Sequence, residues 1–302
     1  MERTEPRLGV LGGSGLYEME GLADVREVWV DTPFGAPSDA VVTGRLGDRA
    51  VAFLPRHGRG HRVPPHALNT RANVYALKKL GVDWLLSVSA VGSLREDVHP
   101  GDVVVVDQFI DRTHGRPSTF FEDGIVAHVT FSDPCCAVMR GVVADAARAA
   151  GARMHDAGTY VCMNGPQFST RAESALHRSW GAAVIGMTAV QEAKLAREAE
   201  MCFATVALAT DYDCWHASGE EVSVAAVLEV LRHNVAMARD VVRRTAAALP
   251  AGARRCPCAI ALEHAVMTAP DRIGPEVRAR LAPLLARRDA SAAAAAARAE
   301  RE

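Results

Sequence analysis

The stretch Leu8-Gly-Val-Leu-Gly-Gly-Ser-Gly-Leu-Tyr17 passes from an apolar run directly into a glycine-rich turn. A short apolar run bounded by turn residues is typical of a buried strand. Glycines permit positive φ and let the backbone approach an anion closely, and Ser14 adds a hydroxyl donor. The stretch therefore predicts a buried strand that ends at a turn suited to anion binding. An ordinary tight turn explains these residues equally well when they are considered alone.

Further apolar runs repeat this pattern along the chain. The additional strands that we predict lie at Ala50–Leu54, Trp84–Ser89, Val103–Asp107, Ala183–Ile185 and Phe203–Ala209. Nearly continuous apolar strands are expected where helices cover both faces of a sheet. Helical periodicity occurs over residues 68–80 and most clearly over 223–249, where Ser223 is suited to cap the helix. The alternation predicts an α/β fold: a single domain with a mixed central β-sheet flanked by helices.

We expect this domain to span residues 1–250 and to be followed by a C-terminal extension over 251–302. The extension becomes rich in alanine from Asp289 onward. Alanine permits a helix, but the segment lacks large apolar residues to bury on one side. We therefore expect a frayed or flexible tail without a catalytic role.

The charge balance excludes several kinds of partner. Among the 302 residues, 34 Lys and Arg side chains nearly balance 36 Asp and Glu side chains. Without a strong field of one sign, the chain is not expected to bind nucleic acid or an anionic membrane. No apolar run approaches the roughly 20 residues of a membrane helix, and the first residues lack the pattern of a secretory signal. These features predict a cytoplasmic protein.

The seven cysteines lack the spacing of a common metal site. Cys135 and Cys136 are adjacent, Cys256 and Cys258 form a C-x-C pair, and the sequence contains no C-x-x-C pair. No cluster of histidines with zinc spacing accompanies them. We therefore expect most of the cysteines to be buried free thiols, and we expect no bound metal.

A second predicted strand ends in basic residues, in the stretch Pro55-Arg-His-Gly-Arg-Gly-His61. Ligands usually bind at strand ends in open α/β sheets. The planar guanidinium of Arg56 suits phosphate, and His57 can donate to an anion. The alternative is a solvated basic loop. This alternative is weakened because the glycine-rich turn after the first strand also suits an anion.

Two further strand ends carry small polar residues. After the strand at 84–89, Ser89 and the backbone amide near Ala90 are placed to contact a ligand, or else they only avoid steric clashes. After the strand at 183–185, Thr188 precedes a helix. Its hydroxyl is suited to cap that helix, to bind an anion at the helix N-terminus, or to do both.

Aromatic and acidic residues follow other segments. Phe168 lies among polar residues in Asn164–Glu173, where it suits stacking on a planar base or anchoring the core. Asp211 and Asp213 follow the strand at 203–209, and their spacing places both carboxylates on one side if the extended conformation continues. In a shielded site, one member of such a pair acquires a raised pKa and serves as a general acid. A solvated turn or a pair of metal ligands is the alternative.

Taken together and in this order, the motifs from about Leu8 to Leu249 resemble those of the trimeric-type purine nucleoside phosphorylase superfamily. Within it, the methylthioadenosine phosphorylase family is most similar. The resemblance implies phosphate-binding roles for Ser14, Arg56, His57, Ser89, Ala90 and Thr188. It implies substrate-binding roles for Phe168, Ser169, Met187, Asp211, Asp213, Val224, His128 and His61, with Asp211 and Asp213 also catalytic.

The reaction implied by the resemblance is attack of phosphate on C1′ of S-methyl-5′-thioadenosine, which releases adenine and 5-methylthioribose 1-phosphate for purine and methionine salvage. Phosphate is a co-substrate, and no other cofactor is expected. Asp211 assists departure of the purine and favours adenine, since relatives that prefer 6-oxopurines commonly have Asn there. The resemblance also implies a homotrimer in which His128 reaches a 5′-alkylthio pocket, across a subunit interface. Some thermophilic relatives carry disulfides near the C-x-C pair, but free thiols are expected in a reducing cytoplasm.

Three other functions are compatible with parts of the sequence. A purine nucleoside phosphorylase acting on adenosine, inosine or methylthioinosine has the same machinery. A nucleosidase uses water, and the anion-binding set of Arg56, His57 and Ser14 argues against it. A non-catalytic dinucleotide-binding module explains the first glycine-rich turn alone, but the G-x-G-x-x-G order is missing.

Overall fold

The computed structural model describes residues 7–13, 16, 18, 20–216 and 224–299, with only the backbone described at 224–229, 231–233, 295–296 and 299. An 11-stranded sheet forms the centre of the described chain. Its strands are β1 (Arg7–Gly12), β2 (Leu22–Val28), β3 (Val41–Leu46), β4 (Arg49–Pro55), β5 (Val82–Ser93), β6 (Val103–Val105), β7 (Gln108–Arg112), β8 (Met154–His155), β9 (Thr159–Met163), β10 (Val184–Gly186) and β11 (Cys202–Asp211). All six strands predicted from apolar runs are present.

The sheet is mixed, as predicted. The strand order is β2-β3-β4-β1-β5-β10-β9-β7, and β11 pairs with β5 and with β6, which in turn pairs with β8. Four neighbouring strands run parallel: β1 pairs with β4 and with β5, and β5 pairs with β11. In contrast, β10 is antiparallel to β5. The carboxyl ends of the four parallel strands therefore meet at one edge region of the sheet.

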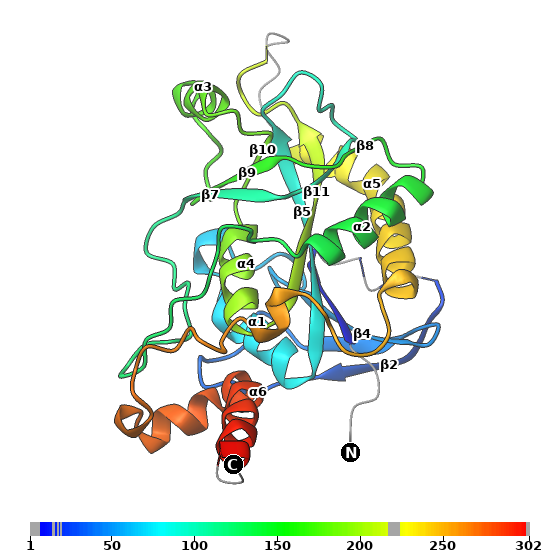
Figure 1. Ribbon diagram of the computed structural model, residues 1–302. Coiled ribbons are helices and arrows are strands. Elements are labelled where there is room, and N and C mark those ends of the chain that lie inside the picture. Colours follow the sequence, from blue (N-terminus) through cyan, green and yellow to red (C-terminus); the bar gives the residue numbers. More distant parts are fainter. Residues whose placement is uncertain (1–6, 14–15, 17, 19, 217–223, 300–302) are drawn as a thin grey trace.

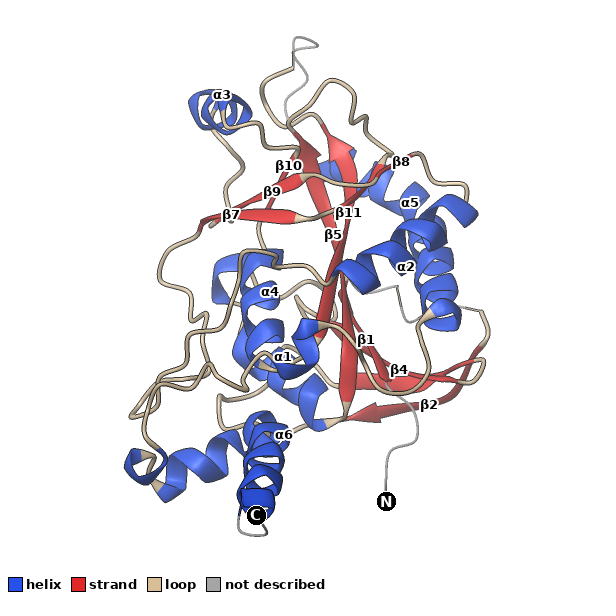
Figure 2. Ribbon diagram, in the orientation of Figure 1, coloured by secondary structure: helices blue, strands red, loops and turns tan. Residues whose placement is uncertain are grey.

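Helices cover both faces of the sheet (Figures 1 and 2). The α-helices are α1 (Thr70–Lys79), α2 (Ala137–Ala149), α3 (Arg171–Ser179), α4 (Ala189–Glu198), α5 (Val224–Ala248) and α6 (Pro275–Ala299). α2 and α5 pack on the face that carries Trp84 and Leu86 of β5, whereas α1 and α4 pack on the face that carries Leu85. The alternation of side chains along β5 supplies apolar residues to both layers.

The C-terminal extension packs onto the second of these layers. Leu262, Ile273, Leu281 and Leu284 are buried in the same cluster as residues of α1 and α4. The helix α6 continues through the alanine-rich residues to Ala299. The expectation of a frayed or flexible tail stays a prediction. The packed first half of α6 nucleates the helix, and alanine then extends it at little cost.

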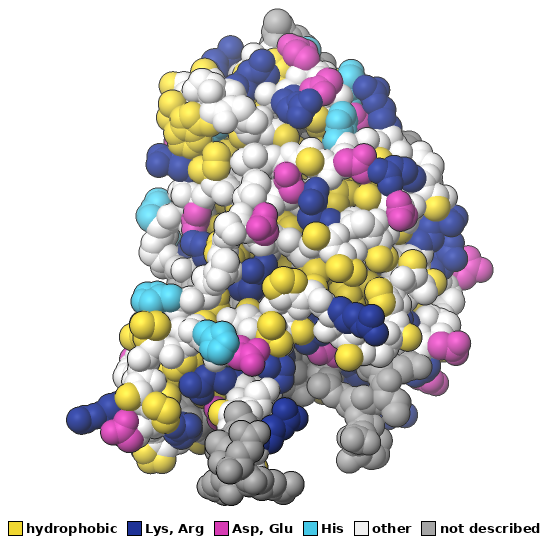
Figure 3. Space-filling view, viewed as in Figure 1, with side chains coloured by type: hydrophobic (Ala, Val, Ile, Leu, Met, Phe, Trp, Pro, Cys, Tyr) yellow, Lys and Arg dark blue, Asp and Glu magenta, His cyan; other side chains and the backbone are white. Residues whose placement is uncertain are grey.

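The surface carries both signs of charge. On the face seen in Figure 3, Lys and Arg side chains are interspersed with Asp and Glu side chains. In the described part of the chain, no helix has the length and hydropathy needed to cross a bilayer.

Candidate active site

A cavity of about 590 Å³ lies at the carboxyl ends of the parallel strands. Most of the described candidate residues line it, although they are distant in sequence. The candidates that line the cavity are Arg56, His57, His61, Ser89, Ala90, Phe168, Met187, Thr188, Asp211 and Asp213. Ser14 and the side chain of Val224 lie outside the described residues. The fold thus gathers the separate strand-end motifs into one site.

Arg56 follows β4 and is held by a dense set of acceptors. Its Nε and Nη2 atoms donate to the carboxylate of Glu192 at 2.7 and 3.1 Å. Nη1 donates to the carbonyl of Val88, and Nη2 also contacts the carbonyl of Leu11 and the hydroxyl of Ser87. These acceptors engage four of the five N–H groups of the guanidinium. Among the described residues, one Nη1 hydrogen has no acceptor, and Arg56 lines the cavity.

His57 is neutral near pH 7. Burial, and next the adjacent positive charge of Arg56, lower its pKa to about 4. Its Nδ1 lies 2.8 Å from the carbonyl oxygen of Val63, so the neutral ring donates there and leaves Nε2 with a lone pair. The ring of His61 stacks on it with the centroids 4.2 Å apart. His57 can therefore accept a proton or a hydrogen bond inside the cavity.

Thr188 occupies the N-cap position of α4, but its side chain makes no capping hydrogen bond. The capping interpretation of its hydroxyl is therefore wrong. Oγ1 is buried and has no partner among the described residues. A buried hydroxyl without a partner is costly, and this one lines the cavity at the positive end of a helix. Ser89 lies nearby in the same wall, with its hydroxyl 3.3 Å from that of Tyr160.

Asp211 and Asp213 both line the cavity, but not by the predicted route. β11 ends at Asp211 after an irregularity in its register with β5, and Asp213 has a left-handed backbone with φ of 51°. The extended conformation therefore does not continue, and the turn instead brings both acids to the cavity. Asp211 accepts hydrogen bonds of 2.8 Å from the Thr210 hydroxyl and from the backbone N–H of Asp213.

Burial of Asp211 raises its pKa, and the charge of Asp213 acts in the same direction. The two hydrogen bonds that Asp211 accepts oppose this shift. Oδ2 of Asp213 is buried without a partner among the described residues. The pair thus provides one carboxyl group that retains a proton above the usual pH range and one acceptor that is free for a ligand.

Two residues that the sequence analysis did not select position the site. Glu192 neutralises Arg56 and accepts a 2.6 Å hydrogen bond from Ser87. Arg116 binds the backbone carbonyls of Met187 and Asn164, and so ties together two loops at the cavity. Glu192 lies in the stretch after Thr188, but only its burial in the fold identifies it.

Two predicted residues lie apart from this cavity. His128 is exposed, and its backbone N–H binds the carbonyl of Ala265 in the C-terminal extension. Ser169 contacts the sulfur of Met163 at 3.8 Å, and Met163 itself lines the cavity. Phe168 does line the cavity but is 43% exposed, so it forms a rim rather than a buried wall.

Comparison with known proteins defines the class first. The model of the phosphorylase superfamily matches residues 7–247. The match spans most of the chain, and the chain belongs to this superfamily.

Individual relatives define the family within it. The S-methyl-5′-thioadenosine phosphorylase of Geobacter sulfurreducens is 56% identical over 278 residues, covering 92% of this chain and 97% of the relative. That of Gloeobacter violaceus is 53% identical over 291 residues, covering 95% and 97%. The chain is therefore an enzyme of the S-methyl-5′-thioadenosine phosphorylase family, which is a family of pentosyltransferases.

Solved structures agree with this assignment. A methylthioadenosine phosphorylase from an Antarctic soil metagenomic library is 45% identical and superimposes with a TM-score of 0.89, covering 94% of this chain and all of that one. The methylthioadenosine phosphorylase of Schistosoma mansoni in complex with adenine is 40% identical, with a TM-score of 0.77 over 80% of this chain and 91% of that one. The predicted fold class and family are both confirmed.

Proposed function

We propose that this enzyme catalyses phosphorolysis of S-methyl-5′-thioadenosine to adenine and 5-methylthioribose 1-phosphate. The observation that carries the proposal is a single cavity that combines anion-binding groups with a protonatable carboxyl group. Phosphorolysis of a nucleoside needs both, since an anion must attack C1′ while the purine leaves with negative charge.

The phosphate site is built from Arg56, His57, Ser89, the amide of Ala90 and Thr188. Glu192 already neutralises Arg56, so the phosphate adds net negative charge to the site. The N-terminus of α4 offsets that charge, together with the Thr188 hydroxyl and the Nη1 hydrogen of Arg56 that have no partner among the described residues. Neutral His57 accepts a hydrogen bond from a protonated phosphate oxygen.

The purine site is built around Asp211, with Asp213 assisting. Cleavage of the C1′–N9 bond develops positive charge on the ribose and negative charge on the purine. The bound phosphate stabilises the first charge, and a proton delivered by Asp211 toward N7 relieves the second. The raised pKa of Asp211 supports this role because the acid must be protonated when the base leaves. Phe168 lies against the base, and Met187 packs against the sugar.

Selection of the 5′ group involves residues on the apolar side of the cavity. Leu16, Val235 and Ala238 line it, and an apolar 5′-methylthio group avoids burying a hydroxyl there without a partner. Ser169, Val224, His61 and His128 complete this selection. His128 is exposed in the single chain, which fits a role in the cavity of a neighbouring subunit.

We also propose that the enzyme is a cytoplasmic homotrimer that acts in purine and methionine salvage. Phosphate is its co-substrate, and no other cofactor takes part. The reaction itself needs neither a protein nucleophile nor a redox group. The carboxyl group of Asp211 accepts from a 6-amino group and so supports a preference for adenine nucleosides. Turnover of adenosine, inosine or methylthioinosine with higher kcat/KM would favour the general purine nucleoside phosphorylase instead.

The deciding experiment measures adenine release from S-methyl-5′-thioadenosine with and without phosphate. We expect release only with phosphate, together with one sugar 1-phosphate for each adenine. Equal release without phosphate would identify a hydrolase and overturn the anion site. Comparison of kcat/KM among the four nucleosides then ranks the substrates.

A further inference from the structure

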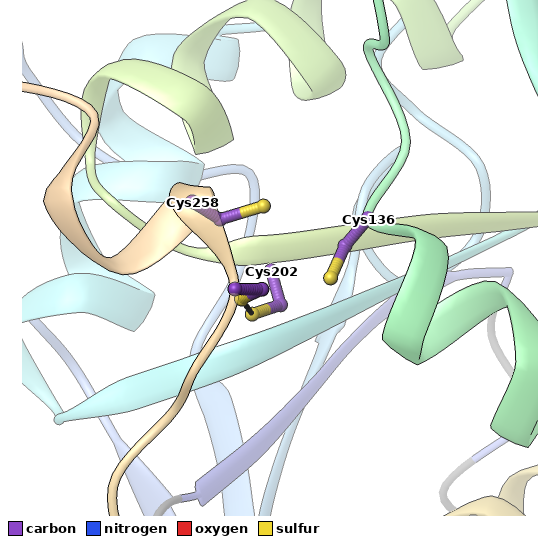
Figure 4. A group of neighbouring side chains, drawn as sticks. Cys136, Cys202 and Cys258 are labelled. Atoms are coloured by element: carbon purple, nitrogen blue, oxygen red, sulfur yellow. Dashed lines mark hydrogen bonds between the residues drawn. The ribbon is translucent and has the colours of Figure 1, made fainter.

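Four cysteines that are scattered along the sequence meet at one buried point. Cys136 precedes α2, Cys202 begins β11, Cys256 precedes the 3-10 helix η2 (Pro257–Ile260), and Cys258 lies within it. Their sulfur atoms all lie within 4.8 Å of one another, and all four residues are buried. Figure 4 shows the side chains of Cys136, Cys202 and Cys258 directed toward a common centre.

The spacing of the cysteines along the chain gives no sign of this cluster. All seven are free thiols in the structure and most are buried, as expected. The expectation that no metal binds used spacing along the chain as its criterion. Spacing does not detect a cluster whose sulfur atoms come from the start of β11, the residue before α2 and the C-terminal extension, and the expectation of no metal stays a prediction.

We propose that Cys136, Cys202, Cys256 and Cys258 bind one zinc ion, which fastens the C-terminal extension to the phosphorylase core. A zinc ion with four thiolates at about 2.3 Å holds the sulfur atoms about 3.8 Å apart. The sulfur atoms of Cys202 and Cys256 lie 3.1 Å apart, and no pair among the four is separated by more than 4.8 Å. The separation of about 3.8 Å that a zinc tetrathiolate needs falls between these two distances.

The ligand type selects the metal. Four thiolates are typical of zinc, Cu(I) and iron–sulfur sites rather than of magnesium or calcium sites. An iron–sulfur cluster places its cysteines on separate iron atoms, which requires wider separation than a single ion does. A closed set of four protein ligands in a buried place is typical of structural rather than catalytic zinc.

The surroundings of the cluster stabilise thiolates. Cys136 occupies the N-cap position of α2, where the helix dipole favours negative charge. A guanidinium nitrogen of Arg254 lies 3.8 Å from the sulfur of Cys202. These donors offset part of the double negative charge of a zinc tetrathiolate.

The position of the cluster assigns it a structural role. β11 runs for 10 residues from Cys202 to Asp211, which is about 30 Å at the usual rise of ~3.3 Å per residue. The ion is therefore far from the reacting atoms. Cys136 and Cys202 belong to the core, whereas Cys256 and Cys258 belong to the extension that follows α5. One ion thus adds a covalent-like link between segments that already meet through apolar packing, through hydrogen bonds such as that of the Leu262 N–H with Glu200, and through the ion pair of Arg287 with Glu200.

Two disulfides are the competing arrangement of the same sulfur atoms, and thiol counting separates the two. Full-length protein from zinc-supplemented cells is purified anaerobically, without reductant or chelator, and its metals are measured by mass spectrometry. We expect about one zinc per chain and seven titratable thiols after denaturation with a chelator. Three thiols, or zinc below about 0.1 per chain even after the reduced protein is incubated with zinc, would overturn the proposal.

Matched variants locate the metal. The pair Cys256→Ser and Cys258→Ser should lower zinc content at least tenfold and lower Tm, whereas Cys135→Ser should keep the zinc, because the sulfur of Cys135 is not in the cluster. If the double variant does not fold, the wild-type protein still decides the matter. Titration with a mercurial should release its zinc as four thiols react, and replacement by Co²⁺ should give the absorption bands of a tetrahedral thiolate site. Zinc retention in the double variant would contradict the assignment.

Discussion

Glu192 binds Arg56 through both carboxylate oxygens, and the two side chains are almost completely buried, at 2% and 4% exposure. Arg56 lines the cavity, whereas Glu192 lies behind it and accepts a further hydrogen bond from Ser87. A buried charge pair contributes little net stability, but removal of one partner leaves the other uncompensated. The pairing therefore fixes the orientation of Arg56 at the proposed phosphate site.

The first prediction concerns this ion pair. Glu192→Ala should lower the free energy of unfolding by about 3–5 kcal/mol, because it leaves the Arg56 guanidinium buried and unpaired. Urea denaturation measures this change. Asp97→Ala is the control, since it breaks the exposed pair with Arg95 and should cost only about 0–1 kcal/mol. Equal effects of the two substitutions would show that the buried pair does not hold Arg56.

The second prediction concerns Asp211, whose pKa is raised in the folded state. The folded protein then binds this proton more tightly than the unfolded chain does, so stability falls as pH rises from the unfolded pKa of about 3.9 to the higher folded pKa, and stays reduced above it. Asp211→Asn should remove this penalty and make the protein more stable at pH 7. It should also lower kcat by a factor of about 10² to 10⁴, the usual contribution of a general acid.

Asparagine at position 211 can keep both hydrogen bonds that the Asp211 side chain makes. Its oxygen accepts from the backbone N–H of Asp213, and the Thr210 hydroxyl, which also contacts the carbonyl of Val91, turns to accept from the amide. Thermal unfolding at pH 5 and pH 8, together with single-turnover kinetics, tests both effects. A variant that is less stable than the wild type at pH 8, or equally active, would contradict the role of Asp211 as the acid.

The third prediction concerns the unpartnered hydroxyl of Thr188. Thr188→Val keeps the shape of the side chain and removes only the donor, so it should raise KM for phosphate by about 10- to 100-fold, as expected for a lost hydrogen bond to a charged group. Stability should not fall, since no partner within the described parts of the chain loses a bond. Initial rates at varied phosphate measure the change.

Thr205→Val provides the matched control for Thr188→Val. Thr205 also has a buried hydroxyl without a partner among the described residues, but it does not line the cavity. Its replacement should leave KM for phosphate unchanged. If both substitutions alter KM equally, the effect arises from packing and not from contact with phosphate.

The sequence was most informative where local pattern and fold agree. Apolar runs identified β1, β4, β5, β6, β10 and β11, because these strands are buried on both faces. β2 was missed because it is an edge strand whose central residues are all exposed, so it lacks such a run. The grouping of the polar residues that follow these strands was also predictable, because parallel strands end at a common edge of the sheet.

Other features depend on contacts that no local pattern contains. Glu192 lies on a helix like many surface acids, and only its position behind β4 and β5 makes it the partner of Arg56. Cys136 and Cys202 are far apart in sequence, yet their strand and helix termini meet. The alanine-rich end of α6 is helical because helix propensity acts on a segment that the packed residues before it have already nucleated.

The last prediction concerns His57, whose pKa is lowered to about 4 by burial and by Arg56. The unfolded chain protonates this residue near pH 6.5 whereas the folded protein does not, so stability is full above pH 6.5 and is lost as pH falls toward 4. At pH 5 the loss should be about 2 kcal/mol relative to pH 7.5. His57→Gln should show a smaller loss over this interval, whereas replacement of exposed His264 should leave the wild-type loss intact.

Phosphate should act directly on this equilibrium. A bound anion near Nε2 favours the protonated ring, so saturating phosphate should raise the pKa of His57 and flatten the fall in stability between pH 7.5 and pH 5. The imidazole signals of nitrogen-labelled protein, assigned by their absence in His57→Gln, report the pKa with and without phosphate. An unchanged pKa at saturating phosphate would place the anion away from His57 and would leave Arg56 and Thr188 as its principal contacts.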